Sequence, residues 1–394
     1  MSSQRQIFFE HIAQTSDFPL ALEIDKAEGM YLYDSAGKKY LDLISGIAVS
    51  NLGHANSQIK QAIKEQVDKH MHLMVYGELV QSVQVLLASK LSTLLPENLG
   101  CVYFTNSGTE ATEGAMKLAK RLSGRTSIAA FKNAYHGSSQ GSLSVCGNEE
   151  LKNAFRPLLP GIEILDYNMP DQLDRINENT AAVILEIIQA EAGIILPSKE
   201  FLLKLSNRCK ATGCLLIVDE IQTAMRRTGP MFAFESTSII PDILLLGKGF
   251  GGGMPLGAFI ASKKMMAAFT HKPVLGNLST FGGHPVSCAA ALASLEQLED
   301  ASWESKIESK EKLFRKLLVH NKIIEIRGKG LFLCLEFENA GMNQEIIGKC
   351  LKKGLFTDWF LFAPNCLRIA PPLIISEEEI ERACTIILDV LNTI

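Results

Sequence analysis

The sequence predicts an α/β fold: a large domain with a mostly parallel seven-stranded sheet, and a smaller α+β domain. Two observations lead to this fold class. Between about residues 100 and 261, short aliphatic runs alternate with amphipathic segments, the pattern of parallel strands joined by helices on both faces of a sheet. After about Pro285, longer helical segments with a few short strands indicate the second domain.

The expected elements follow in chain order. Residues 29–42, which include YLYDSAGKKYLDL, predict a hairpin that packs on the smaller domain. The seven strands are expected at residues 102–106, 127–132, 161–167, 181–188, 214–219, 242–247 and 257–261. Helices are expected at 110–121, 199–211, 287–299 and from residue 377, with further strands near 331–337 and 366–369. These elements predict an N-terminal segment over 1–50 that packs with the small domain, a large domain over 51–285 and a small domain over 286–394.

Composition indicates a globular protein without a nucleic-acid or membrane partner. The 394 residues are 47% hydrophobic, which gives the chain ample core. The net charge is −4, and lysines and arginines are spread along the chain, so nothing favours nucleic acid. We expect a cytoplasmic protein, because the N-terminus lacks the apolar core of a signal peptide. Nine cysteines stand singly and the histidines lack metal spacing, so neither disulfides nor a metal site are expected.

The stretch FTNSGTEATEGAMK joins a predicted strand to a predicted helix. Ser107 and Glu110 have the spacing of a capping box, which is a purely structural interpretation. The same helix start offers free backbone N–H groups and the positive end of a helix dipole to a phosphate. The two interpretations are compatible.

Asp219 ends another predicted strand in an apolar setting. A buried carboxylate is unfavourable unless it meets a positive partner. Asp219 therefore either faces a buried cationic group or caps a helix from a loop.

The stretch LLLGKGFGGGMPLG places Lys248 between an apolar strand and a glycine-rich loop. A P-loop requires a hydroxyl residue directly after its lysine, and Gly249 stands there instead. No GxGxxG dinucleotide motif opens an early helix. Desolvation at the end of a core strand lowers the pKa of a lysine and makes its amine nucleophilic toward carbonyls. These features are typical of a Schiff-base lysine.

Seven motifs together identify a family resemblance. SGTEA, AYHG, LEIIQAEAG, VDEIQ, PDILLLGKGFGGGMPLGA, STFGGHP and LRIAPPL occur in the order and approximate spacing of class III aminotransferases, over nearly the whole chain. The resemblance implies a fold type I enzyme that uses pyridoxal 5'-phosphate and works as a homodimer. The implied reaction moves an amino group between an amino acid or ω-amine, of the acetylornithine, ornithine or 4-aminobutyrate kind, and 2-oxoglutarate or glutamate.

The resemblance also implies a role for each matched residue. Lys248 would bind the cofactor covalently and act as nucleophile and general base, and Asp219 would pair with the pyridinium nitrogen. The remaining cofactor-binding positions are Ser107, Gly108, Thr109, Tyr135, His136, Glu186, Ile221, Gln222 and the partner subunit's Thr280. The glycines after Lys248 are expected to let the backbone pass close to the cofactor.

Substrate choice is predicted from matches and departures. Glu191 and Arg368 match a pair in which the glutamate releases the arginine when glutamate or 2-oxoglutarate binds. Ser138 stands where an arginine for the donor's carboxylate is common. Ile187 replaces a usual proline and Met225-Arg226 a usual Phe-Gly, and we expect these differences to reshape the substrate pocket.

Three alternative functions differ in class. An aminomutase resembling glutamate-1-semialdehyde aminomutase shares YHG, but Gln222 favours the aminotransferase. A dialkylglycine-type decarboxylase is the second alternative. A non-catalytic binding protein of the same fold is disfavoured because Lys248 and Asp219 are both present.

Overall fold

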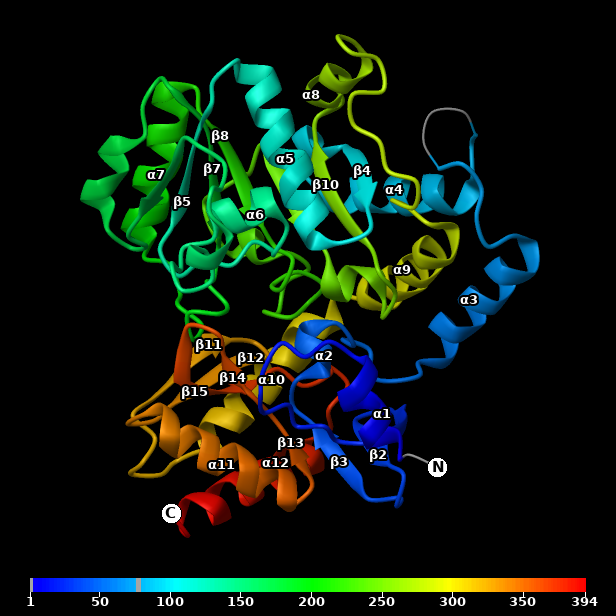
Figure 1. The fold of residues 1–394 in the computed structure, drawn as a ribbon, viewed down its shortest axis with the longest axis vertical. Coiled ribbons are helices and arrows are strands. Elements are labelled where there is room, and N and C mark those ends of the chain that lie inside the picture. Colours follow the sequence, from blue (N-terminus) through cyan, green and yellow to red (C-terminus); the bar gives the residue numbers. More distant parts are fainter. Residues whose placement is uncertain (1–2, 76–78) are drawn as a thin grey trace.

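The computed structural model describes residues 3–75 and 79–394, which form a larger and a smaller body (Figure 1). The larger body contains a sheet with strand order β4-β10-β9-β8-β7-β5-β6. Its strands are β4 (Cys101–Thr105), β5 (Ser127–Phe131), β6 (Ile162–Leu165), β7 (Thr180–Glu186), β8 (Leu215–Asp219), β9 (Ile243–Leu246) and β10 (Gly257–Ala261). All seven expected strands are present. β10 runs antiparallel to β4 and β9 and the other pairs are parallel, so the mostly parallel α/β sheet is confirmed.

β7 illustrates why these runs form a sheet covered on both faces. All seven of its residues are buried, and residues 182–185 alternate between two apolar clusters. Val183 and Leu185 belong to the cluster that includes Phe201 of α7 (Lys199–Thr212). Ile184 belongs to the cluster that includes the alanines of α5 (Gly108–Ser123). A strand covered on both faces needs this continuous apolar run.

Further helices cover the larger body. They are α3 (Ser57–Lys69), α4 (Ser82–Leu94), α6 (Gln140–Val145), α8 (Lys263–Met266) and α9 (Pro285–Leu298), with 3-10 turns η1 (Glu97–Leu99), η2 (Asn153–Phe155), η3 (Pro170–Arg175), η4 (Ala233–Ser236), η5 (Lys248–Gly251) and η6 (Ala267–Thr270). α9 packs against α3 and α4, although the predicted domain limit at residue 285 assigns it to the smaller domain. The domain limits stay a prediction. Among the helices described, none is long and apolar enough to cross a membrane.

The smaller body combines both ends of the chain (Figure 1). One sheet has the order β1-β2-β3-β13 and the other β11-β12-β15-β14. The strands are β1 (Ile24–Glu28), β2 (Tyr31–Asp34), β3 (Lys39–Asp42), β11 (Glu325–Lys329), β12 (Phe332–Glu336), β13 (Leu355–Phe356), β14 (Trp359–Phe360) and β15 (Ala363–Ile369), and the helices are α1 (Gln4–His11), α2 (Ser45–Ala48), α10 (Ser302–Leu317), α11 (Ala340–Lys352) and α12 (Glu377–Leu391). The expected hairpin is β2–β3, and β3 pairs in parallel with β13 from the C-terminal part.

Arg227 joins the two bodies. Its guanidinium is fully buried and donates to the backbone oxygens of Leu331 (2.8 Å) and Pro371 (2.6 Å). It also donates to Asn51 Oδ1 (2.5 Å) and Ser45 Oγ (3.2 Å). Burial lowers the pKa of Arg227 to about 9, and the nearby charge of Asp42 opposes this shift only in part. The bonds fix how the smaller body sits against the carboxyl edge of the large sheet, where ligands of such sheets bind.

Candidate active site

A pocket of about 270 Å³ opens at the carboxyl edge of the large sheet. Ten predicted cofactor residues line it: Ser107, Gly108, Thr109, Tyr135, His136, Glu186, Asp219, Ile221, Gln222 and Lys248. Gly137, Ser138 and Thr223 complete the lining. Thr280 is exposed and does not line the pocket of its own chain. The shared strand direction brings these residues together, because the ends of parallel strands meet at one edge.

Lys248 begins η5, and one residue, Gly247, separates it from the end of β9. Its φ of 48° lies in the left-handed region, which costs a residue with a side chain about 1–2 kcal/mol. Burial lowers the pKa of its amine, and the nearby carboxylates of Glu191 and Asp219 only partly oppose this shift. A larger fraction of the amine is therefore neutral and nucleophilic at neutral pH.

Asp219, the last residue of β8, is held by two contacts. Its Oδ2 lies 2.7 Å from Nδ1 of His136, and its Oδ1 accepts the N–H of Ile221 at 2.9 Å. The Nε2 of His136 is buried and has no partner among the described residues. Both carboxylate oxygens are thereby fixed, and Asp219 presents a rigid negative charge to the pocket.

Glu186 ends β7 directly opposite Asp219 in the sheet register. Its oxygens accept the N–H groups of Tyr135 and Ala190, each at 2.9 Å. Burial raises the pKa of Glu186 to about 7, and the charge of Asp219 adds to the shift while His136 opposes it. Glu186 therefore anchors the backbone of Tyr135 and lines the pocket.

The start of α5 has the geometry of an anion site. Ser107 Oγ accepts the N–H of Glu110 at 3.3 Å, but the Glu110 carboxylate accepts from Asn106 instead of Ser107, so only half of the expected capping box forms. The first backbone N–H groups of a helix have no intrahelical acceptor, and here they belong to Gly108 and Thr109. A Cβ on Gly108 would lie 2.7 Å from Ile221 Cδ1, so glycine lets Ile221 approach this helix end.

Hydroxyl groups that the sequence analysis missed surround Thr109. Its Oγ1 lies 2.8 Å from Ser139 Oγ and 2.5 Å from Ser142 Oγ. Glu113 of α5 accepts the Ser139 hydroxyl at 2.6 Å. No motif marked these serines, and the packing of α6, with Ser139 as its N-cap, against α5 brings them there.

Arg368 and Glu191 form a buried ion pair beside the pocket. The Arg368 Nη2 lies 3.0 Å from Glu191 Oε2, and the two residues are 2% and 4% exposed. Gln222 connects both, since it accepts from Arg368 Nη1 at 3.0 Å and donates to Glu191 Oε1 at 3.3 Å. Burial opposes ionisation of Glu191, but the charge and hydrogen bonds of Arg368 outweigh it and hold the pKa of Glu191 below its usual range.

A second carboxylate, Asp358, was not expected from the sequence. Its Oδ1 accepts from Arg368 Nε at 2.9 Å, and the guanidinium lies over the Phe360 ring at 4.3 Å. Burial raises the pKa of Asp358 to about 6 despite the charge of Arg368. Asp358 and Phe360 therefore contact the Arg368 guanidinium independently of Glu191.

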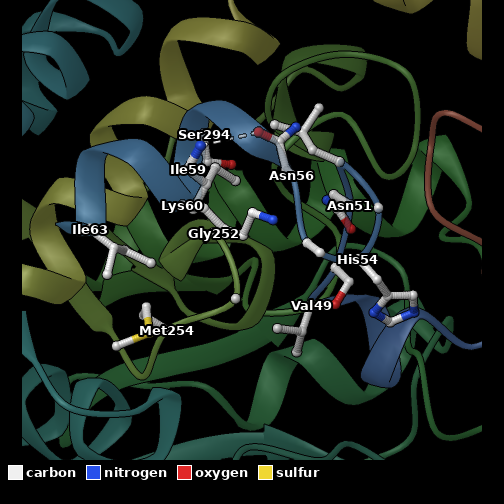
Figure 2. Close-up of a pocket in the computed structure, with 15 residues that line it drawn as sticks. Val49, Asn51, His54, Asn56, Ile59, Lys60, Ile63, Gly252, Met254 and Ser294 are labelled. Carbon is white, nitrogen blue, oxygen red and sulfur yellow. Dashed lines mark hydrogen bonds between the residues drawn. The ribbon is translucent and has the colours of Figure 1, made fainter. Parts of the chain in front are cut away.

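The glycine-rich loop has a different role from the one expected. A Cβ on Gly249 would lie 2.8 Å from Asn51 Nδ2, and one on Gly252 would lie 2.6 Å from the backbone oxygen of Ala290 in α9. None of residues 249–253 lines the cofactor pocket. Gly252 borders a separate cavity of about 240 Å³ with Asn51, Lys60 and Ser294 (Figure 2). These glycines admit neighbouring chain segments, and the expected close passage of the loop at the cofactor stays a prediction.

The other departures also lie away from the pocket. Ile187 borders a different cavity, and Met225 and Arg226 line neither. Arg226 has φ 66°, where a glycine is usual, and its guanidinium donates to the backbone oxygen of Leu298 at 3.0 Å at the end of α9. Arg226 thus donates hydrogen bonds to backbone carbonyls at the C-terminus of α9. Contrary to the expectation, it does not line the substrate pocket.

The donor set of the pocket fits pyridoxal 5'-phosphate. The nucleophilic amine of Lys248 suits the aldehyde of the cofactor, and the fixed carboxylate of Asp219 suits its ring nitrogen. The free N–H groups at the start of α5 suit its phosphate. Among the described residues no cluster of histidine, cysteine or carboxylate side chains could hold a metal, and all nine cysteines are free thiols.

Comparison with known proteins agrees with this geometry. The model of the family "Aminotransferase class-III" matches residues 12–391. The chain is 36% identical to the acetylornithine aminotransferase of Methanopyrus kandleri, over 100% of the chain and 99% of that protein. It is 38% identical to that of Bacillus subtilis, over 92% of the chain and 93% of the relative.

Solved structures are similar as well. Ornithine aminotransferase from Toxoplasma gondii matches with a TM-score of 0.90 and 27% identity, over 98% of this chain and 94% of that one. Another structure of that enzyme holds PLP at partial occupancy in its active site. A transaminase from Virgibacillus shares the fold with a TM-score of 0.92 at 24% identity, over 100% and 99% of the two chains.

The fold and the site define a pyridoxal-phosphate transaminase of fold type I. The chain belongs to the class III aminotransferase family. These relatives are aminotransferases, so the aminomutase, decarboxylase and non-catalytic alternatives are not favoured.

Proposed function

We propose that this transaminase takes the terminal amino group of an ω-amine or amino acid of the acetylornithine and ornithine kind and transfers it to 2-oxoglutarate, which becomes glutamate. The buried trio of Glu191, Gln222 and Arg368 carries this proposal. With Glu191 paired to Arg368, the trio presents no net charge to a substrate. With Glu191 displaced, it presents the free guanidinium of Arg368. These two states suit two substrates that differ in charge. The names of the relatives support the donor class.

The residues of this chain divide the chemistry among them. Bound pyridoxal phosphate supplies an electron sink for the negative charge left when a substrate carbon loses its proton. Lys248 removes that proton and returns it at the other carbon. Asp219, whose carboxylate lies 2.7 Å from His136, would keep the ring nitrogen positively charged, and the backbone N–H groups at the start of α5 would hold the phosphate.

Arg368 acts in the acceptor half of the reaction. While the ion pair is intact, the carboxylate of Glu191 neutralises the charge of Arg368. A donor whose end next to Arg368 is uncharged can then lie beside the pair. A dicarboxylate such as 2-oxoglutarate competes with Glu191 for the guanidinium and forms charge-assisted hydrogen bonds. Asp358 keeps the arginine in place during the exchange.

Replacement of Arg368 by alanine should separate the two half-reactions. We expect the KM for 2-oxoglutarate to rise by about 10²-fold, since the loss of a charge-assisted contact costs ~2–3 kcal/mol. The donor half-reaction should change by less than about fivefold. Single-turnover rates for each half, monitored by cofactor absorbance, make the test, with the exposed Arg175→Ala as control. Equal loss in both halves would show that Arg368 is structural and would end the 2-oxoglutarate assignment.

Ser138 bears on the choice of donor. Its hydroxyl lies 2.9 Å from the Tyr135 hydroxyl at the pocket, and it carries no charge for a donor's carboxylate. We expect Ser138→Arg to raise kcat/KM for acetylornithine or ornithine relative to simple amines by about tenfold, since it adds a carboxylate contact worth ~1.4 kcal/mol. Ser138→Gln, of similar length without charge, is the matched control. An unchanged ratio would mean that another residue binds the carboxylate.

A homodimer with shared sites is part of the proposal. Thr280 is exposed and lies outside the pocket of its own chain, which suits a residue that completes the phosphate site of a neighbour. Apolar side chains beside it are also exposed, with Leu278 at 60% and Phe281 at 53%. Exposed apolar groups of this kind are typical of subunit interfaces. The cytoplasmic location stays a prediction.

A further inference from the structure

A cavity of about 500 Å³ lies at the junction of the two bodies and shares no lining residue with the cofactor pocket. One wall is formed by the loop after β7 and by α7. Lys329, at the end of β11, reaches it from the smaller body. Cavities of this size at a junction between domains are common places for small ligands.

The floor of the cavity is apolar. Ile187 and Ile188 are 2% and 3% exposed and form it directly after the buried strand β7. At the mouth, Leu203 is 55% exposed. An apolar floor that continues to an exposed leucine offers contact to a hydrocarbon chain entering from solvent.

Two lysines give the cavity its charge. Lys199 and Lys329 line it, and within the described residues neither has a hydrogen-bond or ion-pair partner for its ammonium group. None of the described lining residues is acidic. Lys199 is also the first residue of α7, where the helix dipole adds positive potential. The cavity therefore combines an apolar floor with two lysines whose ammonium groups have no partner among the described residues, and Glu200 follows Lys199 in the first turn of α7.

We propose that this cavity binds an amphipathic monocarboxylate, with its alkyl chain on the isoleucine floor and its carboxylate between Lys199 and Lys329. A medium-chain fatty acid has this chemistry. A second copy of this chain is not the occupant we favour. Helix α4, which carries exposed apolar side chains such as Leu86, lies on the far side of the larger body from α7 (Figure 1).

Calorimetric titration of the cofactor-loaded protein tests the proposal with three probes. Decanoate should bind saturably at one molecule per chain. Decylamine, with the same chain and opposite charge, should bind at least about tenfold more weakly, and acetate, which lacks the chain, should not bind measurably. Equal binding of decanoate and decylamine would overturn the anion site.

Variants at the cavity mouth locate the binding. We expect a tenfold rise, roughly, in the Kd for decanoate in each of two variants: the double variant Lys199→Gln, Lys329→Gln and the single variant Leu203→Glu. All three positions are partly or fully exposed, so the variants should still fold. Lys264→Gln and Val319→Glu, at exposed positions elsewhere, are matched controls. Unchanged binding in the cavity variants would overturn the site. Because binding is measured without turnover, this result is independent of the proposed donor and acceptor.

Discussion

Replacement of Lys248 by alanine should abolish turnover while the cofactor still binds. The amine lies at the pocket with a lowered pKa, and its loss removes both the nucleophile and the proton carrier. We expect kcat to fall by at least about 10³-fold, which corresponds to ~4 kcal/mol. Borohydride reduction followed by denaturation should leave the cofactor attached to the wild-type chain and not to the variant.

The control for this variant is Lys263→Ala. Lys263 is an exposed lysine at the start of α8, outside the pocket, and its loss should change kcat by less than about twofold. Wild-type turnover by Lys248→Ala, or cofactor retained covalently on that variant, would remove Lys248 from its assigned role. Phosphate binding at the start of α5 should be unaffected, so the variant also tests that the two functions are separate.

The strands were predictable because burial on both faces leaves a strong signal in the sequence. Residues 181–185 of β7 and all of β9 are continuous aliphatic runs, and each strand was placed within about two residues. The helix expected from residue 287 begins at Pro285 instead, with His284 as its N-cap. Proline suits the first position of a helix because its missing N–H has no intrahelical acceptor there.

The cofactor pocket could also be predicted, since its residues follow strands that point the same way. Glu186 and Asp219 end β7 and β8, and Lys248 lies two residues after the end of β9, so strand order brings the three residues to one edge. Their catalytic and binding roles still rest on the family resemblance and the proposed chemistry. The experiments on Lys248, Asp219 and Arg368 are therefore the tests of those roles.

Contacts that depend on tertiary packing could not be predicted from the sequence. Asp358 reaches Arg368 only because β14 folds back on β15. Arg226 differs from the usual glycine, and the carbonyls that it satisfies belong to the end of α9, more than 70 residues later. Such partners depend on how helices and strands pack, which a local pattern does not specify.

Replacement of Asp219 by asparagine should slow the reaction by about 10²–10⁴-fold. Asparagine keeps the size of the side chain and one acceptor oxygen for His136 or Ile221, so the change removes chiefly the charge. A preorganised charge that stabilises a carbanionic transition state is worth ~3–5 kcal/mol in a buried site. Because Asp219 is 4% exposed, water cannot replace the lost charge.

Single-turnover rates of both half-reactions test this prediction. Asp219 acts on the ring nitrogen in both halves, so both should slow by a similar factor, unlike the one-sided effect of Arg368→Ala. The exposed Asp171→Asn is the matched control and should behave as wild type. If Asp219→Asn stayed within about tenfold of the wild-type rate, or ~1.4 kcal/mol, its carboxylate would serve only to orient His136. Replacement of His136 by asparagine should then have an equally small effect, because it would disturb the same 2.7 Å contact without changing the charge that the pocket presents.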